Sequence, residues 1–323
     1  MYSRSKKSAN ALIPNGSVDI YSDDSGSGKG LDDLLARKDI QAVDVVLPIT
    51  HQPVVIKKAL KAGKHVVRQC PCYTSLLQIS EKPVAPTITE AKELISFYKS
   101  LSSPPVWSVA EQFRYNPVYD YIVSILPQIG KFTYFVQQVS HNVNPGDKYF
   151  ETSWRKTPDY QGGFLLDGGV HFVAGLRKIL PSKISQISAF TRLNREYLTP
   201  VDTVHATLQL EDGSTGLFGV TFAASKGKYE IELMGQDGSI TGKLGYGPES
   251  TVILTKDGKE EKKTLKDDNK IAIFNEFVAF GKAVLEGKVD KSGDPEEALA
   301  DLAVLEFMFK SGEKGAQTIA FNY

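Results

Sequence analysis

The sequence is poor in cysteine, in charge of one sign and in long apolar runs. Among its 323 residues only Cys70 and Cys72 are cysteines, too few for a four-cysteine zinc site, and they do not imply a disulfide framework. Lys plus Arg and Asp plus Glu both number 38, so the zero net charge gives no electrostatic case for nucleic acid or an anionic membrane. No apolar run approaches a membrane span, and residues 1–7 lack the apolar core of a secretory signal. These absences predict a cytoplasmic protein with no nucleic-acid partner, no membrane partner and no metal.

The first 112 residues carry an alternating pattern of strands and helices. The β-branched residues of 42–47 predict a buried strand of a parallel sheet. Residues 51–62, which end at Gly63, predict a helix, and Thr87 or Thr89 can cap the next helix. Further strands are expected at residues 18–21, 64–67 and 106–110. This order predicts a doubly wound, Rossmann-like α/β domain over residues 1–112.

After about Gln112 the pattern changes to alternating strands joined by Asp-Gly turns, which suit hairpins. Five segments are strand-like, namely residues 132–139, 201–210, 216–222, 229–234 and 251–255. Helices are expected at residues 274–285 and after Asp294-Pro295, where an acid precedes a proline in the first turn. Residues 113–323 are therefore predicted to form an α+β domain with a large, mostly antiparallel open sheet.

The glycine-rich segment from Gly162 to His171 is the strongest chemical signal in the chain. Asp167 and His171 are four residues apart, so on a helix both side chains lie on one face. The flanking glycines allow a sharp turn and the close approach of a ligand. A carboxylate beside a histidine can orient and tune the ring for proton transfer. The alternative interpretation is a glycine-rich helix start that carries a buried core histidine.

Several short motifs occur in a fixed order along the chain. They are Ala62-Gly63-Lys64-His65-Val66, Glu81-Lys82-Pro83, Gly162-Gly163 through Asp167 to His171, and Glu297 to Leu302. In this order they resemble the glucose-fructose oxidoreductase/inositol dehydrogenase/MocA (Gfo/Idh/MocA) family of dinucleotide-dependent oxidoreductases. The resemblance runs from the first residues to the last helix. It implies a dinucleotide-binding domain followed by a domain for substrate binding and oligomerisation, and a possible homo-oligomer through the sheet of the second domain.

The resemblance assigns catalytic roles to three residues. Lys82 matches the lysine that lies between nicotinamide and substrate, where it holds or polarises a substrate oxygen. Asp167 matches the acid that positions the substrate hydroxyls and the histidine. His171 matches the general acid/base that takes the hydroxyl proton as hydride leaves. The implied activity is an NAD(P)-dependent dehydrogenase or reductase of a sugar, polyol or dihydrodiol.

Two other functions remain open for a chain of this family. One is a non-enzymatic regulator that senses a dinucleotide, and the other is an inactive fragment. A regulator does not need the proton-transfer pair, so the presence of Asp167 and His171 argues against it.

Cofactor contacts are expected at the carboxyl ends of the strands in the first domain. The predicted cofactor-binding residues are Ser3, Arg4, Pro48, Thr50, His51, Glu81, Lys82 and Arg114. Three of them have equally good structural alternatives: Pro48 can terminate a strand, His51 can cap a helix at the surface, and Arg114 can form a salt bridge that links the domains.

The choice of cofactor depends on the residues at the end of the second strand. NAD enzymes place an acid there, whereas NADP enzymes often place an arginine. The segment Tyr2-Ser3-Arg4-Ser5 holds no acid, and the planar fork of Arg4 can pair with a 2′-phosphate. We therefore expect NADP to be preferred over NAD.

The sequence departs from the family pattern in two places. It has no G-x-G-x-x-G turn after a first strand, and Met1 to Arg4 resembles the end of the second strand, so the first strand and helix are expected to be missing. Residues 68–79 are an insertion that is expected to bulge near Lys82. A missed exon and a retained intron would explain both departures, and the alternative is a diverged protein. We expect a chain of this form to bind dinucleotide poorly.

Overall fold

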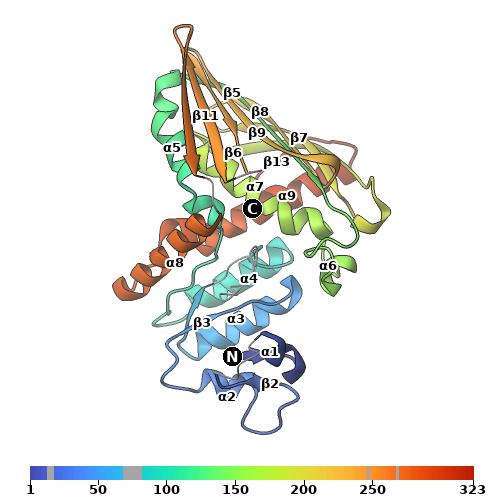
Figure 1. The fold of residues 1–323 in the computed structure, drawn as a ribbon, viewed down its shortest axis with the longest axis vertical. Helices are drawn as coiled ribbons and strands as arrows, with labels where there is room; N and C mark the ends of the chain where they lie inside the picture. The colour runs from blue at the N-terminus through green and yellow to red at the C-terminus, as the bar shows by residue number, and fades with distance from the viewer. Residues whose placement is uncertain (13–17, 68–81, 246–247, 267–268) are drawn as a thin grey trace.

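The structure is a computed structural model that describes residues 1–12, 18–67, 82–245, 248–266 and 269–323. Figure 1 shows the N-terminal elements at one end of the molecule and a large sheet at the other, with helices between them. Cys70, Cys72 and the predicted insertion of residues 68–79 lie outside the described residues. The predicted boundary at residue 112 stays a prediction.

The N-terminal part alternates strands and helices, which confirms the doubly wound class. Its elements are β1 (Tyr2–Ser3), α1 (Lys6–Leu12), β2 (Tyr21–Ser22), α2 (Leu31–Leu35), β3 (Ala42–Asp44), η1 (Ile49–His51), α3 (Gln52–Lys61), β4 (His65–Val67) and α4 (Ile88–Lys99). The strands form two separate parallel pairs, β1 with β2 and β3 with β4. The Rossmann-like sheet is therefore incomplete in the part of the chain that is described.

The prediction of a buried strand over residues 42–47 is wrong in length and in burial. Strand β3 covers only Ala42–Asp44, and both of its end residues are exposed. Because β3 is hydrogen-bonded to β4 alone among the described strands, its other edge lacks the neighbour that buries a central parallel strand. The expected strand at residues 106–110 is reduced to one parallel bridge between Val66 and Trp107.

Local signals placed the helix ends of this part correctly. Gly63, with φ +69°, follows the end of α3, as the glycine C-terminal signal predicts. The side chain of Thr87 accepts a hydrogen bond from the Glu90 amide at the start of α4. These short-range contacts do not depend on the rest of the sheet.

The second part is built on a nine-stranded sheet with the order β12-β11-β10-β9-β5-β8-β7-β6-β13. The strands are β5 (Phe132–Asn142), β6 (Ile184–Arg192), β7 (Thr203–Leu210), β8 (Thr215–Thr221), β9 (Ala223–Gly235), β10 (Gly238–Lys243), β11 (Glu249–Lys256), β12 (Lys259–Lys266) and β13 (Ile319–Ala320). Only the central β5–β8 pair is parallel. The expected mostly antiparallel open sheet is confirmed. The unpredicted strand β12 is a charged edge strand that lacks a period-2 apolar signal.

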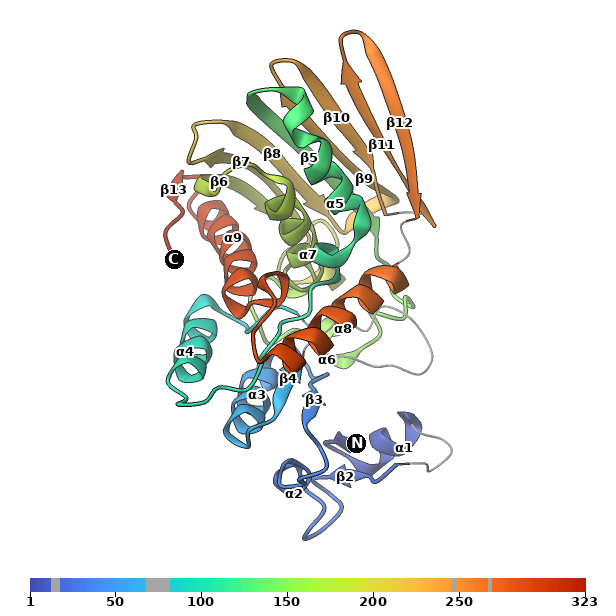
Figure 2. The same cartoon turned by 90° about the vertical axis from the view of Figure 1, so that its left-hand side faces the viewer.

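Helices of the second part cover one face of this sheet. The helical elements are η2 (Gln112–Tyr115), α5 (Pro117–Ile125), η3 (Leu126–Ile129), α6 (Ser153–Lys156), α7 (Gly163–Ile179), η4 (Glu196–Leu198), α8 (Asn269–Glu286), η5 (Lys291–Gly293) and α9 (Pro295–Glu313). Figure 2 shows α5, α7 and α9 on the same face, and α8 crossing between the sheet and the N-terminal elements. Phe135 and Phe218 point from the sheet into the resulting core and are fully buried.

The two parts meet where α4 packs against α9. A carboxyl oxygen of Glu306 on α9 accepts a hydrogen bond from the Ile88 amide at 2.9 Å, and thus satisfies an amide at the start of α4. Thr50 contributes a second link through Asp159. None of the described helices combines the length and apolarity that a bilayer crossing requires.

Candidate active site

Helix α7 begins at a backbone position that only glycine fits. Gly162 and Gly163 have φ values of +72° and +50°, and a Cβ atom on Gly163 would lie 2.2 Å from the carbonyl oxygen of Thr199. The start of the helix is therefore in direct contact with the loop that contains Thr199 and Pro200. Asp167 and His171 lie one helical turn apart on α7, and their side chains are on the same side of the helix, as their spacing predicts.

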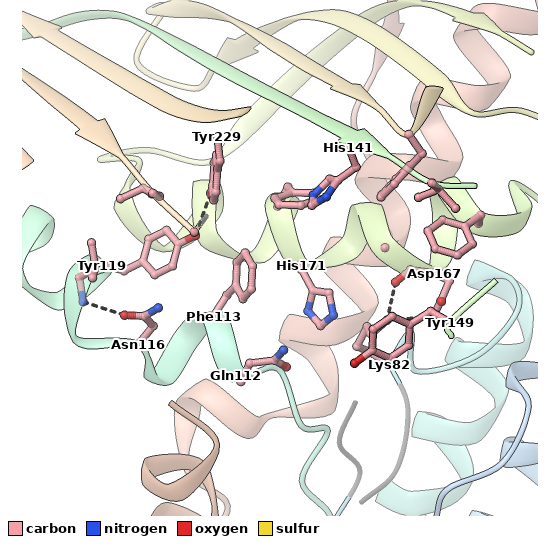
Figure 3. A pocket seen from close by; sticks show the side chains of 18 of the residues that line it. Lys82, Gln112, Phe113, Asn116, Tyr119, His141, Tyr149, Asp167, His171 and Tyr229 are labelled. Atoms are coloured by element: carbon pink, nitrogen blue, oxygen red, sulfur yellow. Dashed lines mark hydrogen bonds and ion pairs between the residues drawn. The ribbon is translucent and has the colours of Figure 1, made fainter. Parts of the chain in front are cut away.

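Asp167 and His171 line a cavity of about 310 Å³, together with Lys82 from the N-terminal part. Figure 3 shows His171 with Phe113 on one side and the Lys82–Asp167 pair on the other. The structure thus brings the three predicted catalytic residues to one cavity.

The carboxylate of Asp167 is held between two buried cations. Lys82 Nζ donates to Oδ1 at 2.8 Å and to the Asp167 carbonyl oxygen at 2.5 Å, and Arg155 Nε donates to Oδ2 at 2.8 Å. Burial opposes ionisation of Asp167, but the charges of Arg155 and Lys82 outweigh it and hold the pKa of the carboxyl well below its usual range. Asp167 therefore fixes the position of the Lys82 ammonium.

His171 takes its carboxylate partner from a different segment. Its Nδ1 atom lies 2.7 Å from Oε1 of Glu111, which is buried at the start of η2. The expectation that Asp167 orients the histidine thus differs from the observed geometry, because both oxygens of Asp167 are engaged by Lys82 and Arg155. Sharing a helix face places two side chains in one cavity but does not pair them.

The pKa values of the Glu111 and Glu276 carboxyls are shifted in opposite directions. Burial opposes ionisation of Glu111, but His171, Arg114 and Lys82 together hold the pKa of its carboxyl below the usual range. Burial, and then the charge of Glu111, raises the pKa of Glu276 on α8 well above normal. Two nearby carboxyls whose pKa values are pushed apart in this way leave one negative charge beside His171.

The residues near Lys82 include a buried acceptor that suits a ligand. Gln112 lines the cavity and is 1% exposed, and its Oε1 atom accepts no hydrogen bond from the described residues. A buried amide oxygen is costly without a donor, and the carboxamide of a nicotinamide supplies one. The chemistry of this end of the site therefore fits a nicotinamide dinucleotide.

Of the predicted cofactor residues, several lie together at an edge of the N-terminal part. The Arg4 guanidinium, which follows Ser3 at the end of β1, is exposed and lies 3.2 Å from Nε2 of His51. Pro48 precedes η1, which contains Thr50 and His51. A cation at this edge suits a phosphate group. Glu81 lies outside the described residues.

The described contacts of Arg114 lie within the second part of the chain, so they include neither the predicted cofactor contact nor a salt bridge that links the domains. Its guanidinium is buried and forms an ion pair with Asp301 on α9. It also donates to the carbonyl oxygens of Ser292 and Glu297 at 3.3 and 3.0 Å. These contacts tie η2, and with it Glu111, to the second part of the chain.

Three residues of the site were not predicted: Glu111, Gln112 and Arg155. Glu111 and Gln112 directly follow the strand expected at residues 106–110, and polar groups after a strand in this fold commonly face the ligand. That position was a usable signal. Arg155 lies 12 residues before Asp167 in a short helix, α6, and no local pattern in the sequence connects the two.

Comparison with known proteins gives two family matches that together span most of the chain. Residues 1–104 match the family described as "Oxidoreductase family, NAD-binding Rossmann fold". Residues 127–321 match "Oxidoreductase family, C-terminal alpha/beta domain". The two matches follow the two parts of the fold described above.

Individual relatives are similar over nearly the whole chain. Dehydrogenase FPY6 of Fusarium mangiferae is 39% identical over 96% of this chain and 87% of its own length. The crystal structure of an oxidoreductase from Thermotoga maritima superposes with a TM-score of 0.80 at 26% identity, over 99% of this chain and 88% of that one. A levoglucosan dehydrogenase solved with NADH and L-sorbose is similar in fold, with a TM-score of 0.79 at 17% identity, over 99% and 88% of the two chains.

Proposed function

Because the chain belongs to the Gfo/Idh/MocA family of oxidoreductases, we propose that it is an NAD(P)-dependent dehydrogenase or reductase of a small hydroxyl or carbonyl compound. We expect its substrate to be a sugar, a polyol or a dihydrodiol. One observation carries it: Lys82 and His171, from different parts of the chain, line one cavity, each held by a buried carboxylate.

The side chains of the site divide the chemistry between them. When bound, the nicotinamide accepts or supplies the hydride. Lys82, fixed by Asp167, places a positive charge where negative charge develops on the substrate oxygen. His171 exchanges the hydroxyl proton, and since Glu111 engages Nδ1, this exchange is assigned to Nε2. The Glu111 carboxylate stabilises the imidazolium that forms, and Gln112 would hold the nicotinamide carboxamide.

The other end of the dinucleotide would lie at Ser3, Arg4, Thr50 and His51, with NADP preferred because of the exposed Arg4 guanidinium. An Arg4→Gln variant is expected to lose about tenfold or more of its NADPH affinity and to keep its NADH affinity, since one charge-assisted bond to phosphate is removed. Lys7→Gln, on the exposed side of α1, is the matched control. Equal affinity of the unaltered protein for NADPH and NADH would contradict the preference.

A homo-oligomer is proposed through the outer face of the sheet. Tyr134 on β5, Leu217 on the neighbouring β8 and Phe190 on β6, which β7 separates from β8, are exposed on that face, with exposed fractions of 39%, 52% and 69%. Apolar side chains gathered on one surface favour association. Light scattering of the protein and of a Leu217→Lys variant tests this, because the variant should dissociate.

The proposed activity is tested by following NADPH absorbance with a panel of polyols, sugars and dihydrodiols. His171→Ala should lower kcat by about 10²–10⁴-fold and leave the affinity for NADPH unchanged, because the proton acceptor is lost while the dinucleotide contacts remain. His205→Ala, on an exposed position of β7, is the control.

Two results would count against this proposal. A parallel loss of turnover and NADPH affinity in His171→Ala would indicate a structural histidine. Tight NADPH binding with no turnover of any compound would favour the dinucleotide-sensing regulator.

A further inference from the structure

The cavity next to His171 is chemically divided, with its ionic groups at one end. Lys82, Arg155 and Asp167 form a closed ionic cluster there, and His171 and Gln112 adjoin it. The remainder of the wall is mostly apolar and aromatic, and Asn116, His141 and Tyr149 add polar groups to it. Its apolar and aromatic side chains are Phe113, Val118, Tyr119, Val143, Phe164, Phe172, Phe222, Tyr229 and Leu244.

Phe113 is the centre of the apolar end. Its ring stacks on the imidazole of His171 with centroids 5.1 Å apart and an interplanar angle of 22°. It also contacts Phe172 edge to face at 5.7 Å and lies nearly parallel to Tyr229 at 6.5 Å. A flat apolar surface thus begins directly beside the proposed proton acceptor, as Figure 3 shows for Phe113 and His171.

Several polar atoms at this apolar end are engaged within the protein. The hydroxyls of Tyr119 and Tyr229 are hydrogen-bonded to each other at 2.7 Å, and Oδ1 of Asn116 accepts from the Val118 amide at 2.9 Å. His141 is held neutral, because burial and the nearby His171 lower its pKa to about 4. Because most of the surface here is carbon, a substrate with hydroxyls all round would lose more water partners than these few polar groups replace.

From this division we infer that the substrate carries a flat apolar ring next to the reacting carbon, and is an aryl- or ring-bearing secondary alcohol or its ketone rather than a fully hydroxylated sugar. This inference rests on the proposed function. In the oxidation direction, the carbinol hydrogen leaves with its electron pair to NAD(P)⁺, the hydroxyl proton passes to His171 and a C=O bond forms. The apolar ring contacts the aromatic wall that Phe113 shares with Phe172 and Phe222, where it gains from burial and aromatic contact.

The cavity volume agrees with a compact substrate. A space of about 310 Å³ is at the lower limit for small-molecule sites, which suits one fused or substituted ring and not an extended chain.

Two probes with vicinal hydroxyls on a ring separate the alternatives: indane-1,2-diol, with an aromatic body, and myo-inositol, with hydroxyls all round. Their binding to the full chain is measured by saturation-transfer NMR competition without cofactor, so that no turnover is needed. Indanediol is expected to bind at least about tenfold more tightly. Equal or tighter binding of inositol, or binding of neither probe, would overturn the inference. A lack of turnover with both probes, while indanediol binds, would overturn only the proposed function.

Leu244→Asn adds an amide to the apolar end and should weaken indanediol binding about tenfold, whereas Leu285→Asn, at an 89% exposed position of α8, should not. Unchanged binding in a folded Leu244→Asn variant would overturn the inference. If Leu244→Asn does not fold, the double variant Tyr119→Phe/Tyr229→Phe tests the inference instead, because it removes only the two paired hydroxyls. Indanediol affinity should stay within about threefold, and a tenfold loss would show that these hydroxyls bind the substrate.

Discussion

At the residue scale, the site depends on carboxylates that hold basic side chains in fixed positions. Asp167 holds Lys82 and Arg155, and Glu111 holds His171. A buried charge without its partner is strongly destabilising, so each of these carboxylates serves both stability and geometry. The two pairs are separate, because no described contact joins the carboxyl group of Asp167 to the His171 ring.

Glu111→Gln should lower kcat by about 10–100-fold while KM and NADPH affinity stay within about threefold. The amide keeps the volume and a hydrogen bond, but it loses the charge that stabilises the imidazolium during proton transfer. Steady-state kinetics and NADPH titration measure the split, and Glu111→Asp should recover part of kcat. A fall in thermal stability with kcat unchanged would assign Glu111 a structural role instead.

His141 should make the protein less stable in mild acid. Burial, together with the charge of His171, lowers its pKa from 6.5 to about 4. Between these values the unfolded chain binds a proton that the folded chain does not, so the free energy of unfolding falls as pH falls through this window. The loss is on the order of 3 kcal/mol. Urea titrations between these pH values should show that the free energy of unfolding depends less on pH in His141→Gln than in the unaltered protein. His205→Gln should behave like the unaltered protein. Equal dependence of the free energy of unfolding on pH in all three proteins would rule out this role of His141.

At the scale of elements, the start of α7 sets where the site lies. Gly162 and Gly163 bring the helix against the loop that holds Thr199, and Gly168 lets it approach the sheet, since a Cβ atom there would lie 2.5 Å from the ring of Phe222. The glycines therefore set the distance between α7 and the structures it packs against. That distance in turn determines where Asp167 and His171 lie in the cavity.

Gly163→Ala should destabilise the protein by about 2 kcal/mol or more. An alanine at φ +50° is strained, and its Cβ would meet the Thr199 carbonyl oxygen at 2.2 Å. The midpoint of thermal unfolding should fall by about 4 °C or more. The matched control is Gly281→Ala in α8, where a Cβ meets nothing within 4 Å, and this change should be neutral or stabilise by about 0.5–1 kcal/mol. A loss of stability in both variants would refute the argument from backbone geometry.

At the scale of the whole molecule, the two ends of the chain differ in how their strands are supported. The second part has nine strands in one sheet with helices on its inner face. The N-terminal part has two strand pairs that share no hydrogen-bonded neighbour among the described residues. Two-stranded pairs are marginal by themselves, because few backbone groups are bonded and little apolar surface is covered.

The β1–β2 pair should therefore open far more often than the central sheet. The Tyr21 amide, which donates to the Met1 carbonyl oxygen, should exchange with deuterium at least about 100-fold faster than the amides of Phe135 and Leu233 on β5 and β9. Hydrogen exchange read by NMR or by mass spectrometry measures this difference. Similar protection at both ends would mean that the N-terminal pair unfolds only with the whole molecule. NADPH should slow exchange at β1 and η1 if the dinucleotide binds there.

Much of the fold follows from the sequence because its causes are local. Alternating side chains and Asp-Gly turns predict β5, β7, β8, β9 and β11 of the second part but not β6, β10, β12 or β13. Thr87 and Asp294 cap the helices that follow them, and Gly63 ends α3. Each of these features depends on residues that are close together in the sequence. The spacing of Asp167 and His171 likewise placed both side chains in one cavity.

The tertiary structure alone decided which groups pair. The partner of His171 is Glu111, 60 residues earlier in the chain, and Lys82 reaches Asp167 across 85 residues. It also decided that β3 has β4 as its single neighbour among the described strands and that aromatic side chains from η2, α7 and β9 meet beside His171. Local periodicity carries no information on such contacts, because they depend on how separate elements pack and on where burial leaves a charge that needs a partner.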